Sequence, residues 1–172
     1  MTEAKNTITI SGNPMELVGG RPGVGEQAPD FEAVTNDMSP FRLSEIKGKV
    51  LVICSVGSLD TSVCDTEVRK FNEQATILGD DVAVLVISMD LPFTQKRWCG
   101  AAGIKNIQTL SDHNKADFGN AYGVLIKDLR LLARTVFVVD KEGVIRYIEI
   151  VDELSNEPDY EEALKAAREA RR

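Results

Sequence analysis

The sequence predicts an α/β fold in which helices cover a mixed β-sheet. Two nearly continuous apolar runs, residues 50–56 and 82–89, have the pattern of strands that are buried on both faces. A helical pattern at about residues 62–78, ended by Gly79, lies between them, so residues 50–89 form a βαβ unit with parallel strands. A hairpin near the C-terminus adds antiparallel strands to this sheet.

An N-terminal β-hairpin precedes the βαβ unit. Residues 7–10 alternate polar and apolar side chains, turn residues 11–14 follow, and residues 15–18 are predicted to return as a second strand. The stretch 19–29 is rich in glycine and proline, which is typical of a loop. This loop connects the hairpin to the rest of the fold.

Shorter elements follow the βαβ unit. Pro92 suits the first turn of a short helix that runs to about Cys99, with Gly100 and Gly103 as stop signals. Two further elements are expected after this helix: a short strand at residues 107–110 and a helix over about 114–122.

The C-terminal third contains the hairpin and a closing helix. Residues 135–139 and 144–151 are rich in strand-forming side chains and are joined by Asp140-Lys141-Glu142-Gly143, a hairpin turn. The final helix begins near Pro158 with acidic residues and ends with arginines, an order that suits the helix dipole. No linker, repeat or low-complexity segment interrupts the chain, so we expect residues 1–172 to form one domain.

The composition argues against several classes of function. The chain has 172 residues, 43% of them hydrophobic and 27% charged, which is enough for a full core. Its net charge of −7, without a cluster of Lys and Arg, argues against nucleic acid or an anionic membrane as the main partner. No apolar run approaches the roughly 20 residues that span a bilayer, and the first residues lack the apolar core of a signal peptide. We therefore expect a cytoplasmic protein.

Cys54, Cys64 and Cys99 are notable in such a protein, because a reducing cytoplasm disfavours structural disulfides. They lack the closely spaced pairs of structural zinc sites, and His113 is the only histidine, so we expect no metal. Core positions and redox chemistry remain as alternatives. Cys54 lies within a buried strand without a polar helper, which favours a core role.

Cys64 lies at a strand-to-helix junction. Backbone N–H groups at a helix start lack partners and the dipole is positive there, and both stabilise a thiolate, the reactive form of cysteine. The thiol belongs to an apolar stripe that faces the protein body: Cys64, Val68, Phe71, Ala75 and Leu78. The opposite side of this helix is expected to carry its charged residues, Asp65, Glu67, Arg69, Lys70 and Glu73. Cys64 is therefore either a small core residue or an enclosed nucleophile.

A nucleophilic Cys64 needs a hydroxyl and a cation beside it. Thr61, three residues earlier, can supply the hydroxyl. Arg134 is the candidate cation, because it precedes an apolar strand expected inside the sheet, where an unpaired charge is costly. A structural ion pair between Arg134 and an acid explains the same position equally well.

Motifs along the whole chain resemble those of the thiol peroxidase branch of the peroxiredoxins. The loop Ser58-Leu59-Asp60-Thr61-Ser62-Val63-Cys64 is similar to the active-site loop of that family. The resemblance extends, in the same order, through residues 12–14, 69–72, 88–93, 97–100, 110–112, 121–124, 132–134 and 157–160. On these motifs the chain is identified as a member of that family.

The resemblance implies a thioredoxin-like fold and a two-cysteine mechanism within one subunit. Cys64 matches the residue that attacks the peroxide O–O bond and becomes a sulfenic acid, and Cys99 matches the residue that resolves it as an intramolecular disulfide. Thr61 and Arg134 match the residues that hydrogen-bond the peroxide oxygens and the thiolate. The resemblance further implies hydrogen peroxide and alkyl or lipid hydroperoxides as substrates, thioredoxin as the reductant, a homodimer, and no metal or organic cofactor.

One residue departs from the family pattern. Gly57 stands where the family has a proline, three residues before Asp60. Proline fixes φ and removes a hydrogen-bond donor, whereas glycine relaxes both constraints. We therefore expect a less rigid and less shielded loop before Cys64, with every reacting group still present.

Three rival functions remain open. A thioredoxin-like disulfide exchanger normally carries Cys-x-x-Cys at a helix start, which Cys64 lacks. A cysteine hydrolase needs a histidine base, and His113 has the pattern of a solvated residue at a helix start. An inactive binding module on the same fold is the non-enzyme alternative. It is favoured only if glycine at position 57 is a sign that catalytic activity has been lost.

Overall fold

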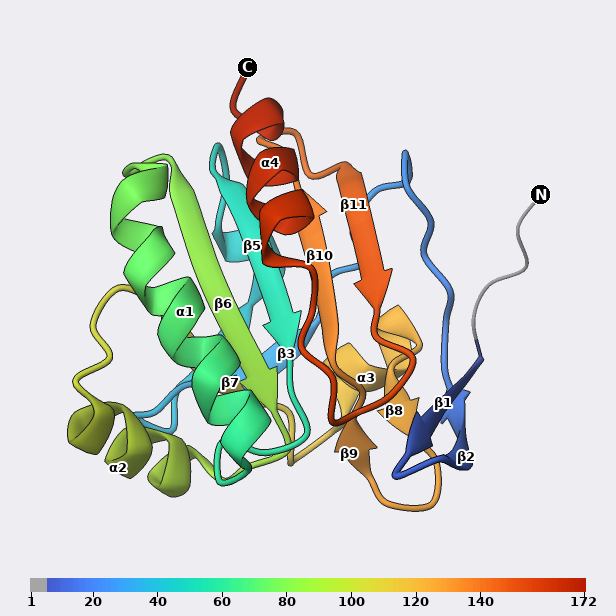
Figure 1. Ribbon diagram of the computed structural model, residues 1–172. Coiled ribbons are helices and arrows are strands. Elements are labelled where there is room, and N and C mark those ends of the chain that lie inside the picture. The colour runs from blue at the N-terminus through green and yellow to red at the C-terminus, as the bar shows by residue number, and fades with distance from the viewer. Residues whose placement is uncertain (1–5) are drawn as a thin grey trace.

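A computed structural model describes residues 6–172 (Figure 1). Its strands are β1 (Thr7–Ile10), β2 (Asn13–Val18), β3 (Glu32–Val34), β4 (Pro40–Arg42), β5 (Val50–Ser55), β6 (Val82–Ser88), β7 (Gln108–Ser111), β8 (Leu125–Ile126), β9 (Leu131–Leu132), β10 (Thr135–Val139) and β11 (Ile145–Ile150). Its α-helices are α1 (Ser62–Leu78), α2 (Pro92–Ala102), α3 (Asp117–Tyr122) and α4 (Tyr160–Ala170), and a short 3-10 helix covers Leu43–Glu45.

The main sheet is mixed, as the sequence predicts. Its strand order is β11-β10-β5-β6-β7-β3-β4. The central strands β5, β6 and β7 are parallel, and the outer strands run antiparallel to their neighbours. Every residue of β5 is buried, because this strand has neighbours on both edges and side chains packed on both faces. The predicted βαβ unit is confirmed as β5-α1-β6.

Two hydrophobic clusters lie on the two faces of this sheet. α1 and α4 cover the face that is turned toward the viewer in Figure 1, and the β5 residues Val50, Val52 and Cys54 lie beneath them. The opposite face, where α3 lies, packs aromatic rings against the sheet: Phe31, Phe118, Tyr122 and Phe137. The strand that leads to Cys64 is thus enclosed from both sides.

The N-terminal hairpin is confirmed, and it belongs to a second, small sheet. β1 pairs antiparallel with β2, and β2 begins at Asn13, slightly earlier than predicted. β2 pairs in turn with β8, and β8 with β9. The sequence does not predict β3, β4, β8 or β9, because strands of two or three residues are too short to show a periodic pattern.

α2 is longer than predicted. It continues through Gly100 and ends at Ala102, where Gly103 adopts the left-handed conformation at φ 68° and donates its N–H to the carbonyl oxygen of Cys99. A single glycine within a helix costs only about 1 kcal/mol relative to alanine, so Gly100 does not end the helix. Only the second glycine acts as the stop signal.

α3 begins at Asp117, not near residue 114. The buried carboxylate of Asp112 accepts hydrogen bonds from the N–H groups of Phe118 at 3.0 Å and Gly119 at 2.9 Å, and so anchors the helix start. A tertiary contact of this kind leaves no trace in the periodicity of the sequence. No helix formed by residues 6–172 has the length and apolar character needed to cross a membrane.

Gly123 ends α3 and provides a test of this packing. It has a φ of 69°, and a Cβ atom there would overlap the carbonyl oxygen of Gly20, so Gly123→Ala combines backbone strain with a clash. Gly103 is the matched control, because its φ is 68° and no atom lies within 4 Å of an added Cβ. We expect Gly103→Ala to lower the free energy of unfolding by about 1 kcal/mol and Gly123→Ala by about 3 kcal/mol, measured by urea denaturation. Equal losses would contradict the clash.

Candidate active site

Cys64 lies in the first turn of α1, after the loop that leaves the carboxyl end of β5. The residue is 1% exposed and belongs to the cluster that α1 and α4 form against the sheet. Val68, Phe71 and Leu78 are buried on the same face of α1, which confirms the predicted stripe. The thiol therefore points into the protein, close to the positive end of the α1 dipole.

Arg134 brings a buried positive charge to this thiol. It is 2% exposed, and its Nη2 donates a hydrogen bond to Cys64 Sγ at 3.3 Å. The sheet register explains its place: Thr135 at the start of β10 pairs with Ser55 at the end of β5, so the preceding residue lies beside the loop that leads to Cys64. The structure thus places a buried positive charge within hydrogen-bonding distance of the sulfur.

The remaining hydrogen bonds of Arg134 hold it in this orientation. Its Nη1 donates to Glu67 Oε2 at 2.5 Å, and its Nε and Nη2 donate to the carbonyl oxygen of Leu154 at 3.0 and 2.7 Å. The structural ion pair considered from the sequence is therefore present, and the same side chain also contacts the thiol. A guanidinium bound on several sides stays aligned with its partners.

The prediction that Glu67 lies on the exposed side of α1 is wrong. Its side chain is 0% exposed because it faces Arg134. Glu67 follows Cys64 by three residues and precedes Phe71 by four, and both steps return to the same face of a helix. This spacing is the signal that could have located the residue in the site.

The Glu67 carboxyl is close to a change of charge at neutral pH. Burial raises its pKa to about 7, although the neighbouring Arg134 lowers it. Oε2 binds Arg134, but the buried Oε1 has no hydrogen-bond partner among residues 6–172. An unpartnered carboxylate oxygen is costly in apolar surroundings, which favours the protonated form.

Thr61 is the N-cap residue of α1, and its side chain is exposed. Its Oγ1 donates a hydrogen bond to the carbonyl oxygen of Ser58 at 3.0 Å. Within residues 6–172 no hydrogen bond joins this hydroxyl to Cys64. The structure thus brings Arg134 to the thiol but leaves Thr61 bonded to the preceding loop.

Asp90 fastens this loop to the segment that follows β6. Its carboxylate accepts hydrogen bonds from Ser58 Oγ at 2.7 Å and from the N–H of Leu59 at 2.9 Å. Gly57, in the same loop, has room for a larger residue, since a Cβ there would lie 3.6 Å from the Leu154 side chain. Side-chain hydrogen bonds therefore hold a loop that glycine leaves free to move.

Cys99 is half-buried in α2, with its Sγ 3.4 Å from Thr109 Oγ1 of β7. Cys64 and Cys99 are both free thiols, and each has a different partner. The structure thus represents the reduced arrangement of the two residues.

The other candidate residues lie outside this site. Cys54 is fully buried in β5, and burial raises the pKa of its thiol well above the ordinary value, so its predicted core role is confirmed. His113 lies between β7 and α3, four residues before the helix, so its prediction as a helix-start residue is wrong. Across residues 6–172, no three His, Cys, Asp or Glu side chains gather as a potential metal site.

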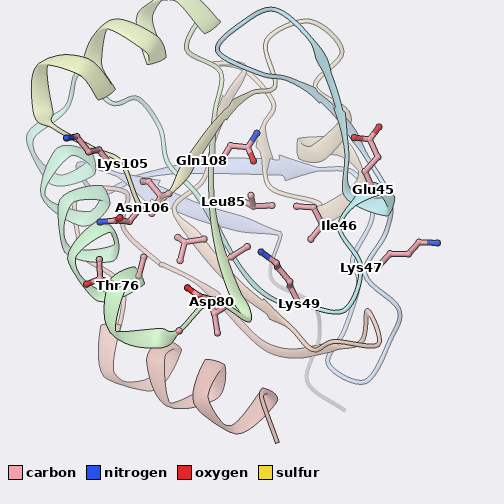
Figure 2. Close-up of a pocket in the computed structure, with 16 residues that line it drawn as sticks. Glu45, Ile46, Lys47, Lys49, Thr76, Asp80, Leu85, Lys105, Asn106 and Gln108 are labelled. Carbon is pink, nitrogen blue, oxygen red and sulfur yellow. The ribbon is translucent and has the colours of Figure 1, made fainter.

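A large cavity lies at the other end of the sheet (Figure 2). Its volume is about 800 Å³, and its lining includes Lys49 before β5, Asp80 before β6, and Lys105. Cys64 follows the carboxyl end of β5, so the thiol and the cavity are at opposite ends of that strand. A search for the functional site by cavity size alone would therefore miss the thiol.

Glu67→Gln tests the charge of the buried carboxyl. The pKa of Glu67 rises from its ordinary 4.5 to about 7 in the folded protein, so the folded state keeps a proton that the unfolded chain releases, and stability falls as the pH rises through this window. Glutamine does not titrate. Relative to the unsubstituted protein, the free energy of unfolding of Glu67→Gln should therefore increase from about pH 4.5 to about pH 7 and then level off. Chemical denaturation at each pH measures it, and a difference independent of pH would contradict this assignment.

Known proteins are similar to this chain in sequence. The family model described as Redoxin matches residues 23–164. A thiol peroxidase from Halalkalibacterium halodurans is 53% identical over 164 residues, which cover 95% of this chain and 98% of that protein. A thiol peroxidase from Bacillus subtilis is 53% identical over 161 residues, which cover 94% of this chain and 96% of that protein.

The likeness extends to solved structures. A peroxiredoxin-like protein from Aquifex aeolicus matches with a TM-score of 0.90 and 41% identity, covering 98% of this chain and 99% of that chain. The mixed sheet with flanking helices is thus the predicted thioredoxin-like fold. Because its relatives are named for peroxidase activity, the protein is an enzyme, an oxidoreductase of the peroxidase class. The chain belongs to the Redoxin family and, within it, to the thiol peroxidases.

Proposed function

We propose that this enzyme reduces hydrogen peroxide and alkyl or lipid hydroperoxides in the cytoplasm, with Cys64 as the nucleophile and thioredoxin as the final reductant. The observation that carries the proposal is the buried hydrogen bond of 3.3 Å from Arg134 Nη2 to Cys64 Sγ. A buried cation beside a thiol at a helix start is a setting in which cysteine serves as a nucleophile. These are the conditions that attack on a peroxide requires.

In the first step the Cys64 thiolate attacks one oxygen of the peroxide. The S–O bond forms as the O–O bond breaks, so the sulfur loses two electrons and the peroxide gains them. The transferred oxygen keeps its hydrogen, which makes Cys64 a sulfenic acid. The departing oxygen takes a proton and leaves as water or an alcohol. Negative charge therefore moves from sulfur to oxygen, and donors near that oxygen lower the barrier.

Arg134 and Thr61 supply the polar contacts for this step. Arg134 already donates to the sulfur, and its charge stabilises the oxygen on which charge develops. The Thr61 hydroxyl donates its proton to the carbonyl oxygen of Ser58, which leaves its lone pairs free to accept from the peroxide hydroxyl. An exposed hydroxyl beside a buried thiol can orient a substrate as it enters.

In the second step Cys99 resolves the sulfenic acid. Its sulfur attacks the Cys64 sulfur, the S–S bond forms, and the S–O bond breaks with loss of water. Disulfide exchange with reduced thioredoxin then returns both thiols. Cys99 is only half-buried, which suits a residue that has to change partners during the cycle.

The proposal includes a homodimer. Leu91 and Phe93 at the start of α2 are 50% and 65% exposed, and they offer apolar surface to a second subunit. They follow Asp90, which binds the loop before Cys64, so a subunit contact there would adjoin the reacting thiol.

Replacing the cysteines one at a time separates the two steps. We expect Cys64→Ser to lose catalytic peroxide consumption, because the nucleophile is gone. Cys99→Ser should react once with peroxide and then stall unless an external thiol resolves it. Cys54→Ala is the matched control and should keep both steps. Stopped-flow assays measure the rates of both steps. They use hydrogen peroxide and a bulky alkyl hydroperoxide as substrates, with thioredoxin as the reductant. Turnover by Cys64→Ser would rule the mechanism out.

Thiol titration separates the rival functions. A peroxidase of this kind loses two thiols per peroxide and gains a Cys64–Cys99 disulfide. A disulfide exchanger is oxidised by a disulfide partner, and a binding module loses no thiol to one equivalent of peroxide.

Gly57→Pro tests the stiffness of the loop before Cys64. The nearest side chain to an added Cβ is Leu154 at 3.6 Å, which is ordinary van der Waals contact, so a Cβ fits at this position. Proline fixes φ and narrows the conformations of the loop, so the rate constant for peroxide attack should rise by about twofold to fivefold. Gly57→Ala adds a Cβ without fixing φ and serves as the control. Stopped-flow oxidation is the measurement, and an unchanged or lower rate for Gly57→Pro would show that loop stiffness does not limit the reaction.

A further inference from the structure

Trp98, the only tryptophan of the chain, joins α2 to the first turn of α1. Its Nε1 donates a hydrogen bond to Asp65 Oδ1 at 3.0 Å. The other carboxylate oxygen of Asp65 accepts a hydrogen bond from Arg69 Nε at 2.8 Å, and the Arg69 guanidinium lies 5.7 Å from the centroid of the Trp98 ring. We call these three side chains, Asp65, Arg69 and Trp98, the latch.

The latch connects the two segments that carry the reacting cysteines. Asp65 directly follows Cys64, and Trp98 directly precedes Cys99. Trp98 also packs against the hydrophobic cluster that contains Cys64. In Figure 1, α2 lies beside the end of α1 at which α1 begins. A hydrogen bond between the sequence neighbours of the two thiols therefore joins the two segments.

Each thiol has a different partner in the reduced protein. Cys64 Sγ accepts from Arg134 Nη2 at 3.3 Å, and Cys99 Sγ lies 3.4 Å from Thr109 Oγ1. A disulfide needs the sulfurs about 2.05 Å apart and the two Cα atoms within about 7 Å. Each sulfur therefore has to exchange its present partner for the other sulfur before the bond forms.

α2 is the segment that opens more easily. It buries only Pro92 and Gln95, both in its first half, whereas α1 buries five residues. The side-chain amide of Gln95 donates to Ser88 Oγ at 3.0 Å and to the carbonyl oxygen of Leu110 at 2.8 Å, which fixes the beginning of the helix. Segments with few buried residues open at low free energy. The half of α2 that carries Cys99 is thus the part free to move.

We propose that the latch holds this half of α2 in place and that its opening sets the rate of disulfide formation. The inference rests on the two-step chemistry proposed above. Trp98 is a positioning residue, because it acts through the Cys99 sulfur, whose attack forms the S–S bond, breaks the S–O bond and releases water. The sulfenic acid of Cys64 persists while the latch is closed and is resolved once it opens.

Trp98→Phe tests the proposal, because it keeps an aromatic ring and removes the N–H. We expect the rate constant of disulfide formation to increase about tenfold, the change expected for loss of one hydrogen bond to a charged group. The rate constant of peroxide attack should stay unchanged, because Arg134 keeps its contact with Cys64. Over-oxidation of Cys64 by excess peroxide should decrease, since the sulfenic acid lives for less time. Rapid quenching with a thiol reagent, followed by mass spectrometry, measures all three.

Two controls separate the latch from general destabilisation of α2. Lys96→Ala removes an ion pair of the same helix that does not involve α1, in which Lys96 Nζ lies 3.5 Å from the Asp37 carboxylate. This substitution should leave both rate constants unchanged. In a double-mutant cycle, the effects of Trp98→Phe and Asp65→Ala on disulfide formation should not add, because both remove the same hydrogen bond.

The outcomes distinguish the latch from the proposed function. If the unsubstituted protein forms no disulfide with peroxide, the proposed function fails. If it forms the disulfide and Trp98→Phe does so at the same or a lower rate, only the latch is overturned. If Trp98→Phe folds poorly, the fluorescence of Trp98 in the unsubstituted protein shows instead whether the latch opens. The emission should move to longer wavelength as the disulfide forms, and an unchanged emission would overturn the latch.

Discussion

The buried charge of Arg134 is the constraint on which the site depends. A guanidinium that is 2% exposed is tolerated only when acceptors surround it. Those acceptors come from α1, through Cys64 and Glu67, and from the carbonyl oxygen of Leu154 after β11. β10 supplies the arginine itself. Three segments therefore meet at one cation, and the same guanidinium that joins them also contacts the thiol.

The loop before α1 is likewise held in place by hydrogen bonds to a side chain from another segment. Cys64 follows this loop in the first turn of α1, yet Gly57 gives the loop backbone no stiffness of its own. Asp90 supplies the restraint through hydrogen bonds to Ser58 and Leu59. Unlike a fixed φ, such bonds can break and re-form. The loop can thus be ordered in this structure and still be able to rearrange.

The centre of the fold could be predicted from sequence, because a short apolar run rich in β-branched residues, such as residues 50–56, is typical of a strand buried on both faces. The start of α3 could not, because the carboxylate of Asp112 decides it through tertiary contacts. In the site, Cys64 and Arg134 were detectable because each is unusual for its position. Glu67 was missed because its charge suggested exposure, although its spacing fitted the buried face. Contacts across many residues, such as those of Arg134, follow from the register of β10 on β5, which sequence periodicity does not contain.

The burial of Cys54 gives the protein an internal reporter of its own unfolding. This thiol lies in β5, between β10 and β6, at 0% exposure, and burial raises its pKa well above the ordinary value. A water-borne alkylating reagent can reach it only when the central sheet comes apart. Cys99 is only half-buried in α2, so a reagent can reach it without that opening. Timed alkylation of the native protein would therefore record opening of the sheet at Cys54, with Cys99 as a partly exposed reference thiol in the same chain.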